Sequence, residues 1–181
     1  MLKTDSLEEL VREAGDGPIS QVVLADQAER DGAAQEGLLQ KMRETLEVMR
    51  ESAQAGLSPD LKSMSGMTGG QAAKLIAHVR SGESASGTLV GEACAVALGV
   101  AELNAAMGRI VAAPTAGACG ILPGVLLTYG KAKGATDDEL VQALFTAAGV
   151  GGVIAARASI SGAQAGCQAE CGAASAMAAA A

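Results

Sequence analysis

The sequence predicts an all-α protein whose core consists of small and aliphatic side chains. Hydrophobic residues occupy 49% of the 181 positions, yet there is no Trp, one Phe and one Tyr. Alanine and leucine favour helices, and the aromatic and β-branched residues that strands prefer are scarce. The length suits one domain with a real core. We therefore expect a single compact bundle of mostly buried Ala- and Gly-rich helices over residues 1–181.

Residues 1–57 have the pattern of an amphipathic helical scaffold. Ser6-Leu7-Glu8-Glu9 is a capping box that predicts a first helix, and Pro18 to Arg30 predicts a second. A third helix follows from apolar residues at helical spacing. These are Leu38, Leu39, Met42, Leu46, Met49 and Ala53, with Lys41, Arg43, Glu44 and Arg50 outside.

The composition changes at Ser58, and residues 58–181 alternate glycine-rich loops with apolar helices. "SPDLKSMSGMTGGQAAKL" is a polar loop that opens a helix near Gln71, and "SGESASG" precedes a long helix over about 88–107. Thr136-Asp137-Asp138-Glu139 is another capping box, whose helix we expect to run towards Gly149. The segment after it consists almost entirely of small residues.

The charge pattern argues against nucleic acid and membrane as partners. The net charge is −7, and the 13 Lys and Arg residues are scattered, whereas both partners require a basic patch. The most membrane-like run, 110–129, is interrupted by Pro114 and Pro123, and no signal peptide opens the chain. We expect a soluble, cytoplasmic protein.

Few residue types that perform catalysis are present. His78 is the only histidine, which excludes a two-histidine metal site; it is either a solvated side chain or the base of a Cys–His pair. No GxGxxG motif follows a strand, and "SGMTGGQAAK" lacks the Gly-Lys-Ser/Thr order of a P-loop. The sequence therefore predicts no nucleotide-binding motif.

The four cysteines are Cys94, Cys119, Cys167 and Cys171, and without a signal peptide they favour metal binding or catalysis over disulfides. Cys94 lies among small apolar residues, and packing explains it better than a functional role does. Cys167 and Cys171 share one face if a helix continues through both. Gln168 and Glu170 lie beside Cys167 in an otherwise apolar segment, and buried polar groups are costly unless paired, which indicates a site there.

Three glycine-rich loops with hydroxyl side chains precede or follow apolar helices. Ser65 and Thr68, together with backbone N–H groups at the start of the next helix, could cradle a carboxylate or phosphate. Asn104, the only asparagine, ends an apolar helix, and Thr115 follows in "APTAGACG". A capped loop without function has the same composition, but three such loops suggest one small polar pocket at converging helix ends.

The last residues, "AASAMAAAA", favour a helix and carry no glycine cap, polar tail or closing charge. From this pattern we expect the chain to be a C-terminally truncated piece of a longer protein.

Three segments together, "KSMSGMTGGQAAKL", "LNAAMGRIVAAPTAGACGILPG" and "SISGAQAGCQAECGAASAMAAAA", closely resemble the α subunit of bacterial iron–sulfur-dependent L-serine dehydratase. The resemblance covers residues 62–181 in order and extends more loosely to Met1. It implies an all-helical catalytic domain that converts L-serine to pyruvate and ammonia without pyridoxal phosphate. It also implies a 4Fe-4S cluster on three cysteines, whose open iron acts as a Lewis acid on the substrate hydroxyl.

The resemblance assigns roles to individual positions. The first cluster cysteine of the family motif falls on Cys167, and Gln168 and Glu170 match the motif as well. Cys171 replaces a small aliphatic residue and is not expected to be a ligand. The other two ligand cysteines of the family are expected beyond residue 181. As given, the chain should then hold no complete cluster and should be inactive alone.

The resemblance also makes several loop groups plausible substrate contacts, and it leaves the base open, with Glu170 as the candidate because it is a carboxylate near the cluster cysteine. The expected substrate contacts are Ser65, Thr68, Asn104, Thr115, Gly117 and Ser161. A separate β subunit is the expected partner, and a homo-oligomer is compatible with the resemblance.

Two alternative functions stay open at this point. The related L-cysteine desulfidase family shares the general pattern, and a non-catalytic helical piece that only binds the β subunit would have the same sequence features. Cys119, in "APTAGACG", could be a reactive thiol near a helix start. The resemblance moves the ligand role to Cys167 and leaves Cys119 as a small side chain where backbones come close.

Overall fold

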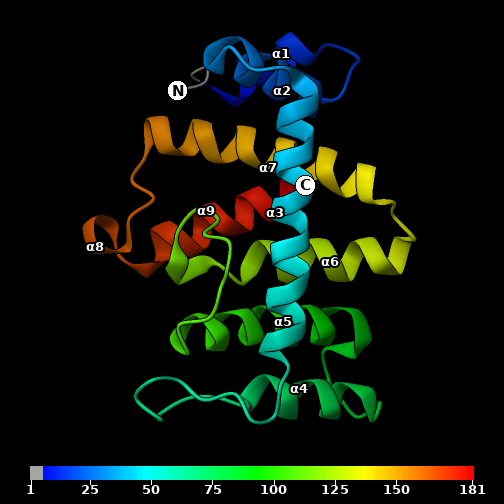
Figure 1. Cartoon of the computed structure of the whole chain (residues 1–181), viewed down its shortest axis with the longest axis vertical. Coiled ribbons are helices and arrows are strands. Elements are labelled where there is room, and N and C mark those ends of the chain that lie inside the picture. Colours follow the sequence, from blue (N-terminus) through cyan, green and yellow to red (C-terminus); the bar gives the residue numbers. More distant parts are fainter. Residues whose placement is uncertain (1–5) are drawn as a thin grey trace. The chain divides into compact units, whose positions relative to one another are not determined.

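The computed structural model describes residues 6–181, and within that range the chain forms nine α-helices and no strand, so the prediction of an all-α fold is confirmed (Figure 1). The elements are α1 Leu7–Ala14, α2 Ile19–Asp31, α3 Gln35–Gly56, α4 Gln71–Arg80, α5 Gly87–Ala105, a 3-10 turn η1 Ala116–Ala118, α6 Ile121–Lys133, α7 Asp137–Arg157, α8 Gly162–Ala165 and α9 Cys167–Ala180.

The helix starts follow the capping residues of the sequence. The Ser6 hydroxyl accepts a hydrogen bond from the Glu9 amide at 3.1 Å and begins α1. At the start of α7, Thr136 accepts from the Glu139 amide, and the Glu139 carboxylate accepts from the Thr136 amide at 2.7 Å. This complete capping box satisfies two amides that a helix start would otherwise leave unpaired.

Helix α7 continues to Arg157 instead of ending at Gly149, as the glycines in the sequence had suggested. These glycines are contact positions inside the helix. A Cβ on Gly149 would lie 2.5 Å from Cγ2 of Val23, and one on Gly151 would lie 2.8 Å from the Met177 sulfur. Glycine is therefore present because neighbouring side chains need the space, and it does not mark a helix end.

The described residues divide into two compact units. The first unit consists of the residues up to Leu46 together with Thr136–Ala181, and the second unit is Glu47–Ala135. The sequence predicted one domain with a change of character at Ser58. Neither boundary between the units falls at that position.

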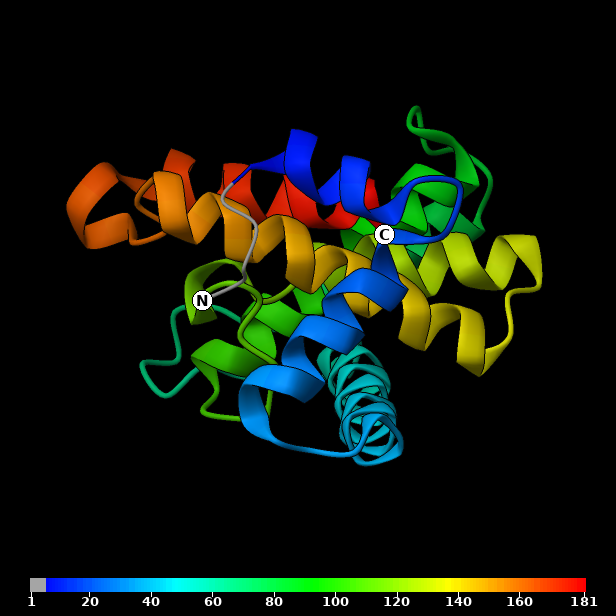
Figure 2. The same ribbon diagram turned by 90° about the horizontal axis from the view of Figure 1, so that it is seen from above.

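In the first unit, α7 is the central helix and packs against α2 and α9 (Figure 2). Its buried face includes Leu144, Phe145 and Val153, and α9 contributes Ala174 and Met177. The buried side of α9 consists of alanines and one methionine, so the two helices can pack closely without large side chains.

In the second unit, α5 lies between α4 and α6 (Figure 1). Glycines allow the helices to approach backbone to backbone. A Cβ on Gly124 of α6 would lie 2.8 Å from the Ala93 carbonyl oxygen of α5, and Gly120 faces the Ala97 carbonyl. Around Val100, which is fully buried, Ala53 and Cys119 complete a small core cluster.

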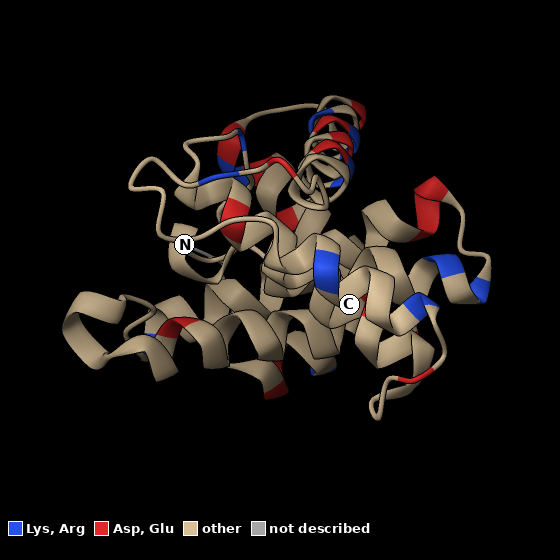
Figure 3. Ribbon diagram, turned by 90° about the horizontal axis from the view of Figure 1, so that it is seen from below, with Lys and Arg blue, Asp and Glu red and all other residues tan. Residues whose placement is uncertain are grey.

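Charged residues are unevenly distributed along the chain (Figure 3). Helix α3 carries both signs on its exposed positions, whereas α9 has the single carboxylate Glu170. Helices α5 and α7 are long and apolar enough to cross a membrane by length and composition, a test that the core helices of soluble proteins also pass. Helix α5 packs against α4 and α6, and helix α7 packs against α2 and α9, as helices in a protein core do.

Candidate functional site

The predicted site residues fall into two groups, one in each unit. The first unit contains Ser161, Cys167 and Glu170, which lie at or near the ends of the short helix α8 and the start of α9. The second unit contains the other predicted substrate contacts, namely Ser65, Thr68, Asn104, Thr115 and Gly117. Each group is built by its own local hydrogen bonds.

The loop before α4 is closed by Ser63, a residue that the sequence analysis did not single out. Its amide donates to the Thr68 carbonyl at 2.8 Å, and its hydroxyl accepts from the Thr68 amide at 3.1 Å. The Ser63 and Ser65 hydroxyls lie 3.2 Å apart, and the Ser65 hydroxyl also accepts from the Met67 amide. Because one hydrogen joins the two hydroxyls, the pair retains one further hydrogen for an external acceptor.

Ser63 and Ser65 differ in exposure. Ser63 is buried, whereas Ser65 and Thr68 are exposed on the loop. The buried hydroxyl therefore holds the loop in shape, and the exposed hydroxyls are available to a ligand. Ser65 and Thr68, which the sequence analysis proposed as substrate contacts, are therefore both accessible to a ligand.

The expected carboxylate cradle at the start of α4 is already filled by a side chain of the protein. Glu102 of α5 is 5% exposed, and its two carboxylate oxygens accept hydrogen bonds from the Gln71 amide at 3.0 Å and the Ala72 amide at 3.2 Å. These amides form the first turn of α4, where a negative charge is favoured. The prediction that this helix start could hold a substrate carboxylate is wrong for these two amides.

Glu102 was detectable in the sequence, although we did not identify it. It is a carboxylate near the end of a mostly apolar helix, and a buried carboxylate is tolerated only when it is paired or hydrogen-bonded. The signal is the carboxylate in "VAELNA", a charged group among apolar residues, as Glu170 is in its own segment.

The end of α5 also contacts the loop that contains "APTAGACG". The Asn104 side-chain amide donates to the Ala116 carbonyl at 3.1 Å. Thr115 is half-buried and precedes the 3-10 turn, and Gly117 is exposed within it. The Ala105 carbonyl accepts from the Met64 amide at 3.2 Å. The last turn of α5 therefore joins the Ser63–Thr68 loop and the 113–119 loop through separate hydrogen bonds.

Cys119 is a buried packing residue. Its side chain is 1% exposed and lies against Val100, whose carbonyl oxygen is 3.9 Å from the thiol sulfur. Burial raises the pKa of the Cys119 thiol, because the charged thiolate would lose its solvation. This thiol is therefore not activated, although it lies near a helix start. His78, by contrast, is exposed on α4.

In the first unit, Cys167 is the first residue of α9, and its side chain is exposed. Helix continues through Cys171, so the two exposed thiols share one face, as the spacing predicted. Glu170 is half-buried, and its carboxylate rests against α8, where a Cβ on Gly162 would lie 3.0 Å from the nearer oxygen. Ser161 precedes α8, and its amide donates a hydrogen bond to the Ser159 hydroxyl oxygen at 3.2 Å.

Among residues 6–181 there is no group of three or more His, Cys, Asp or Glu side chains arranged to hold a metal ion. Cys167 can serve as a single cysteine ligand, because its side chain is exposed at the start of α9. A metal centre with several protein ligands would therefore need ligands besides Cys167 that residues 6–181 do not place next to it.

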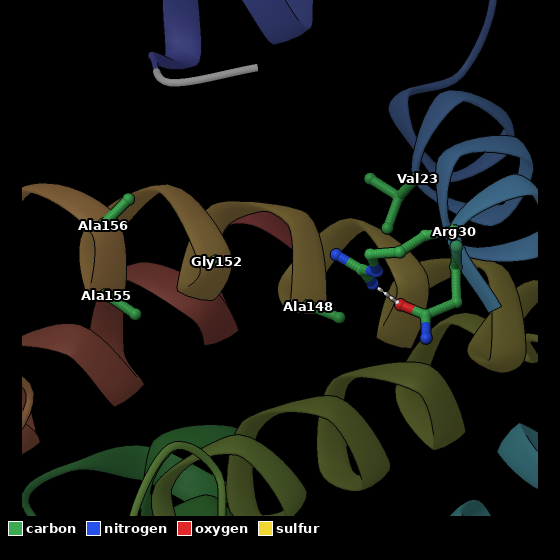
Figure 4. A pocket seen from close by; sticks show the side chains of 7 residues that line it. Val23, Arg30, Ala148, Gly152, Ala155 and Ala156 are labelled. Atoms are coloured by element: carbon green, nitrogen blue, oxygen red, sulfur yellow. Dashed lines mark hydrogen bonds between the residues drawn. The ribbon is translucent and has the colours of Figure 1, made fainter. Parts of the chain in front are cut away.

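Two hollows lie away from the predicted residues. A hollow of about 540 Å³ between α2 and α7 is lined by Arg30 and Gln27, which are hydrogen-bonded to each other, and by small residues of α7 (Figure 4). The Arg30 guanidinium also forms ion pairs with Asp26 and Asp31, so its charge is offset locally. This hollow contains no reactive side chain.

The second hollow is an apolar groove of about 390 Å³ between α5 and α6. Its walls include the partly exposed side chains Leu89, Val90, Val125 and Tyr129, and Cys94 is the only thiol. The groove could accommodate an apolar group but offers little to orient a polar substrate. The polar loops at the end of α5 are therefore the better candidate for chemistry in the second unit.

The described residues thus form an all-helical protein with hydroxyl-bearing loops at the end of α5 and an exposed cysteine at the start of α9. Residues 16–181 match the family described as serine dehydratase alpha chain. The chain therefore belongs to the serine dehydratase alpha-chain family.

Relatives with this description are similar over most of the chain. A probable L-serine dehydratase alpha chain of Bacillus subtilis (strain 168) is 46% identical over 163 residues, which cover 90% of this chain and 54% of the relative. The L-serine dehydratase alpha chain of Peptoniphilus asaccharolyticus is 37% identical over 90% of this chain and 56% of its own.

An L-serine dehydratase of Escherichia coli (strain K12), TdcG, is 52% identical over 85 residues, 46% of this chain and 19% of that protein. The chain spans about half the length of the alpha chains that it matches. No solved structure matches it.

Proposed function

We propose that this chain is part of an L-serine dehydratase, which removes water and then ammonia from L-serine to form pyruvate. The observation that carries this proposal is the match of residues 16–181 to the serine dehydratase alpha-chain family. The names of the relatives in Bacillus subtilis and Peptoniphilus asaccharolyticus support the same substrate.

The loops of the second unit would bind the amino-acid part of serine. The hydrogen retained by the Ser63–Ser65 hydroxyl pair can be donated to the substrate carboxylate. Thr68 is exposed on the same loop and offers a second hydroxyl. Asn104 holds the loop that contains Thr115 and Gly117, and these residues complete the proposed set in this unit. Because Glu102 occupies the first amides of α4, the carboxylate would be bound by these loop groups instead.

In the first unit, Glu170 is the proposed base that removes the α proton of serine. Its carboxylate lies half-buried against α8, and a carboxylate held next to a substrate can accept a proton as a general base. Ser161, at the start of α8, is the proposed additional contact to the substrate.

Cys167 is the proposed ligand of a 4Fe-4S cluster. The cluster would need further cysteine ligands, which residues 6–181 do not place beside Cys167. When bound, such a cluster with one open iron would supply a Lewis acid for the departure of the serine hydroxyl, a poor leaving group. The residues of the chain would hold the substrate carboxylate and amine and accept the α proton. We propose no role for pyridoxal phosphate.

The designation of the relatives as alpha chains supports a separate β subunit as partner. We further propose a cytoplasmic enzyme that binds neither nucleic acid nor membrane, in line with its net charge of −7. A homo-oligomer is compatible with this proposal.

The test is an assay of pyruvate formation from L-serine, carried out without oxygen on the complete enzyme with its partner subunit and after supply of iron and sulfide. We expect turnover that is lost in Cys167→Ala and retained in Cys94→Ala, a matched change at an exposed thiol of the other unit. Sulfide release from L-cysteine in place of pyruvate formation would point to a desulfidase. Binding of the β subunit without turnover of either substrate would point to a non-catalytic subunit.

The ligand role of Cys167 is tested separately by the visible absorption of the reconstituted cluster. Cys167→Ala should take up less iron and sulfide than the unchanged protein, and Cys94→Ala should take up the same amount. Equal cluster content in both variants would overturn the ligand assignment while leaving the activity proposal to the pyruvate assay.

A further inference from the structure

Among residues 6–181, Glu102 is the most deeply buried charged side chain that the proposed chemistry does not use. It is 5% exposed, and both of its oxygens are engaged by amides of another helix, the Gln71 and Ala72 N–H groups of α4. Hydrogen bonds from amides to a carboxylate are stronger than those to a neutral acceptor, and burial strengthens them further. Glu102 therefore fixes the start of α4 to the last turn of α5.

The connection reaches the loop that precedes α4. Gly70 adopts a positive φ of 74° immediately before Gln71, and Gly69 faces the backbone of Leu61, where no side chain would fit. The chain between the Ser63–Thr68 loop and Gln71 therefore has little freedom to adjust. A displacement of the α4 start would be transmitted directly to Ser65 and Thr68.

The same turn of α5 holds the second loop. Asn104, two residues after Glu102, donates to the Ala116 carbonyl at 3.1 Å, and the Ala105 carbonyl accepts from the Met64 amide at 3.2 Å. One hydrogen bond from this helical turn thus reaches each glycine-rich loop of the second unit, and two more hold the start of α4. Without them, each loop would be held mainly by its own contacts.

We infer that Glu102 is a positioning residue for substrate binding, which sets the Ser65 and Thr68 loop relative to the Thr115 loop through the start of α4. The inference rests on the proposed function, because it assigns these loops to the substrate. Glu102 acts through α4, because it is 5% exposed and both of its oxygens face the α4 amides.

The test is the variant Glu102→Gln in the complete enzyme. It keeps the size of the side chain but replaces one acceptor oxygen by an amide group that cannot accept a hydrogen bond. We expect KM for L-serine to rise about tenfold, with kcat within roughly a factor of two, because the binding loops move and the reacting groups do not. Glu92→Gln, at a half-exposed position of the same helix, is the control and should leave both constants unchanged.

Glu102→Asp supplies a second variant that keeps the charge. The shorter carboxylate can reach one of the two amides, so KM should fall between those of the unchanged enzyme and Glu102→Gln. A lowered melting temperature with unchanged KM in both variants would make Glu102 a purely structural cap and overturn the inference.

Amide hydrogen exchange gives a readout that does not depend on activity. In Glu102→Gln we expect faster exchange in both 63–70 and 113–118, as well as in the first turn of α4. Faster exchange limited to 71–74 would overturn the inference. Absence of pyruvate formation by the unchanged enzyme would instead overturn the proposed function. The exchange pattern alone would then show whether Glu102 positions the two loops.

Discussion

Gly56, the last residue of α3, and Gly99 of α5 lie in direct backbone contact. A Cβ on Gly99 would lie 2.9 Å from the Gly56 carbonyl carbon, a distance that side chains do not adopt next to a fixed backbone. The contact lies beside Val100, the fully buried residue of the core cluster of this unit. The pair determines how closely the end of α3 approaches α5.

Gly99→Ala should therefore destabilise the protein. Overpacking of a core by a methyl group costs about 1–3 kcal/mol, which exceeds the roughly 1 kcal/mol that alanine gains over glycine in a helix. Denaturant unfolding followed by far-UV circular dichroism measures the change. Gly37→Ala in α3 is the control, because no atom lies within 4 Å of the added Cβ, and it should stabilise the protein. Equal stability of the two variants would contradict the close contact.

The capping box of α7 should produce a pH-dependent stability in acid. Hydrogen bonds from the Thr136 amide and hydroxyl lower the pKa of the Glu139 carboxyl group in the folded state. A depressed pKa in the folded state means that the stabilisation is present above the pKa of the unfolded state and is lost as the pH falls through the folded value. The difference in melting temperature between the unchanged protein and Glu139→Gln should accordingly be largest near neutral pH and vanish in acid.

Glu8→Gln provides a control for this measurement, because Glu8 lies in the first turn of α1 and the pH dependence tested belongs to the Thr136–Glu139 pair. A difference between unchanged protein and Glu139→Gln that stayed constant from neutral pH into acid would contradict the assignment.

The four cysteines should differ in their reaction with an alkylating reagent. Cys94, Cys167 and Cys171 are exposed in the protein without metal, whereas Cys119 is buried and its thiol has a raised pKa. Since the thiolate is the reactive form, Cys119 should be alkylated more than roughly tenfold more slowly. Peptide mass spectrometry after a short pulse of iodoacetamide would measure all four sites, and addition of denaturant should abolish the difference. Early labelling of Cys119 in folded protein would refute its packing role.

Substitution of the two serines in the loop before α4 should have different effects, one on substrate binding and the other on stability. Ser65→Ala removes the exposed hydroxyl, so we expect KM for L-serine to rise about tenfold with little change in stability. Ser63→Ala removes the buried hydroxyl that accepts from the Thr68 amide, which should cost about 1 kcal/mol of stability. Steady-state kinetics and thermal unfolding of both variants test this. Equal effects of the two substitutions on KM would indicate that Ser65 acts only through the shape of the loop.

The fold was largely predictable because local signals and tertiary structure agree in most helices. Ser6, Gln71 and Thr136 mark helix starts in the sequence and in the structure alike. The end of α7 was not predictable, because Gly149 is required by the Val23 side chain of another helix, and one sequence does not reveal which neighbour a glycine faces. The same limit applies to the division into two units, which depends on contacts between distant segments.

The sequence identifies candidate residue types for the proposed site but not the contacts that each residue makes. Hydroxyl and amide groups in glycine-rich loops pointed to Ser65, Thr68 and Asn104, and the last of these indeed holds a loop carbonyl. The role of Ser63 depends on the Thr68 amide, which the fold of its own loop brings next to it. The role of Glu102 appears only when α4 and α5 are placed side by side.

The last turn of α5 has a consequence for the dynamics of the protein. Because Glu102, Asn104 and Ala105 are the common anchor of two loops, fraying of this one turn would release both loops in a single event. The loops would then open and close together, and access to the region between them would follow the opening equilibrium of a helix end instead of the separate motions of two flexible segments.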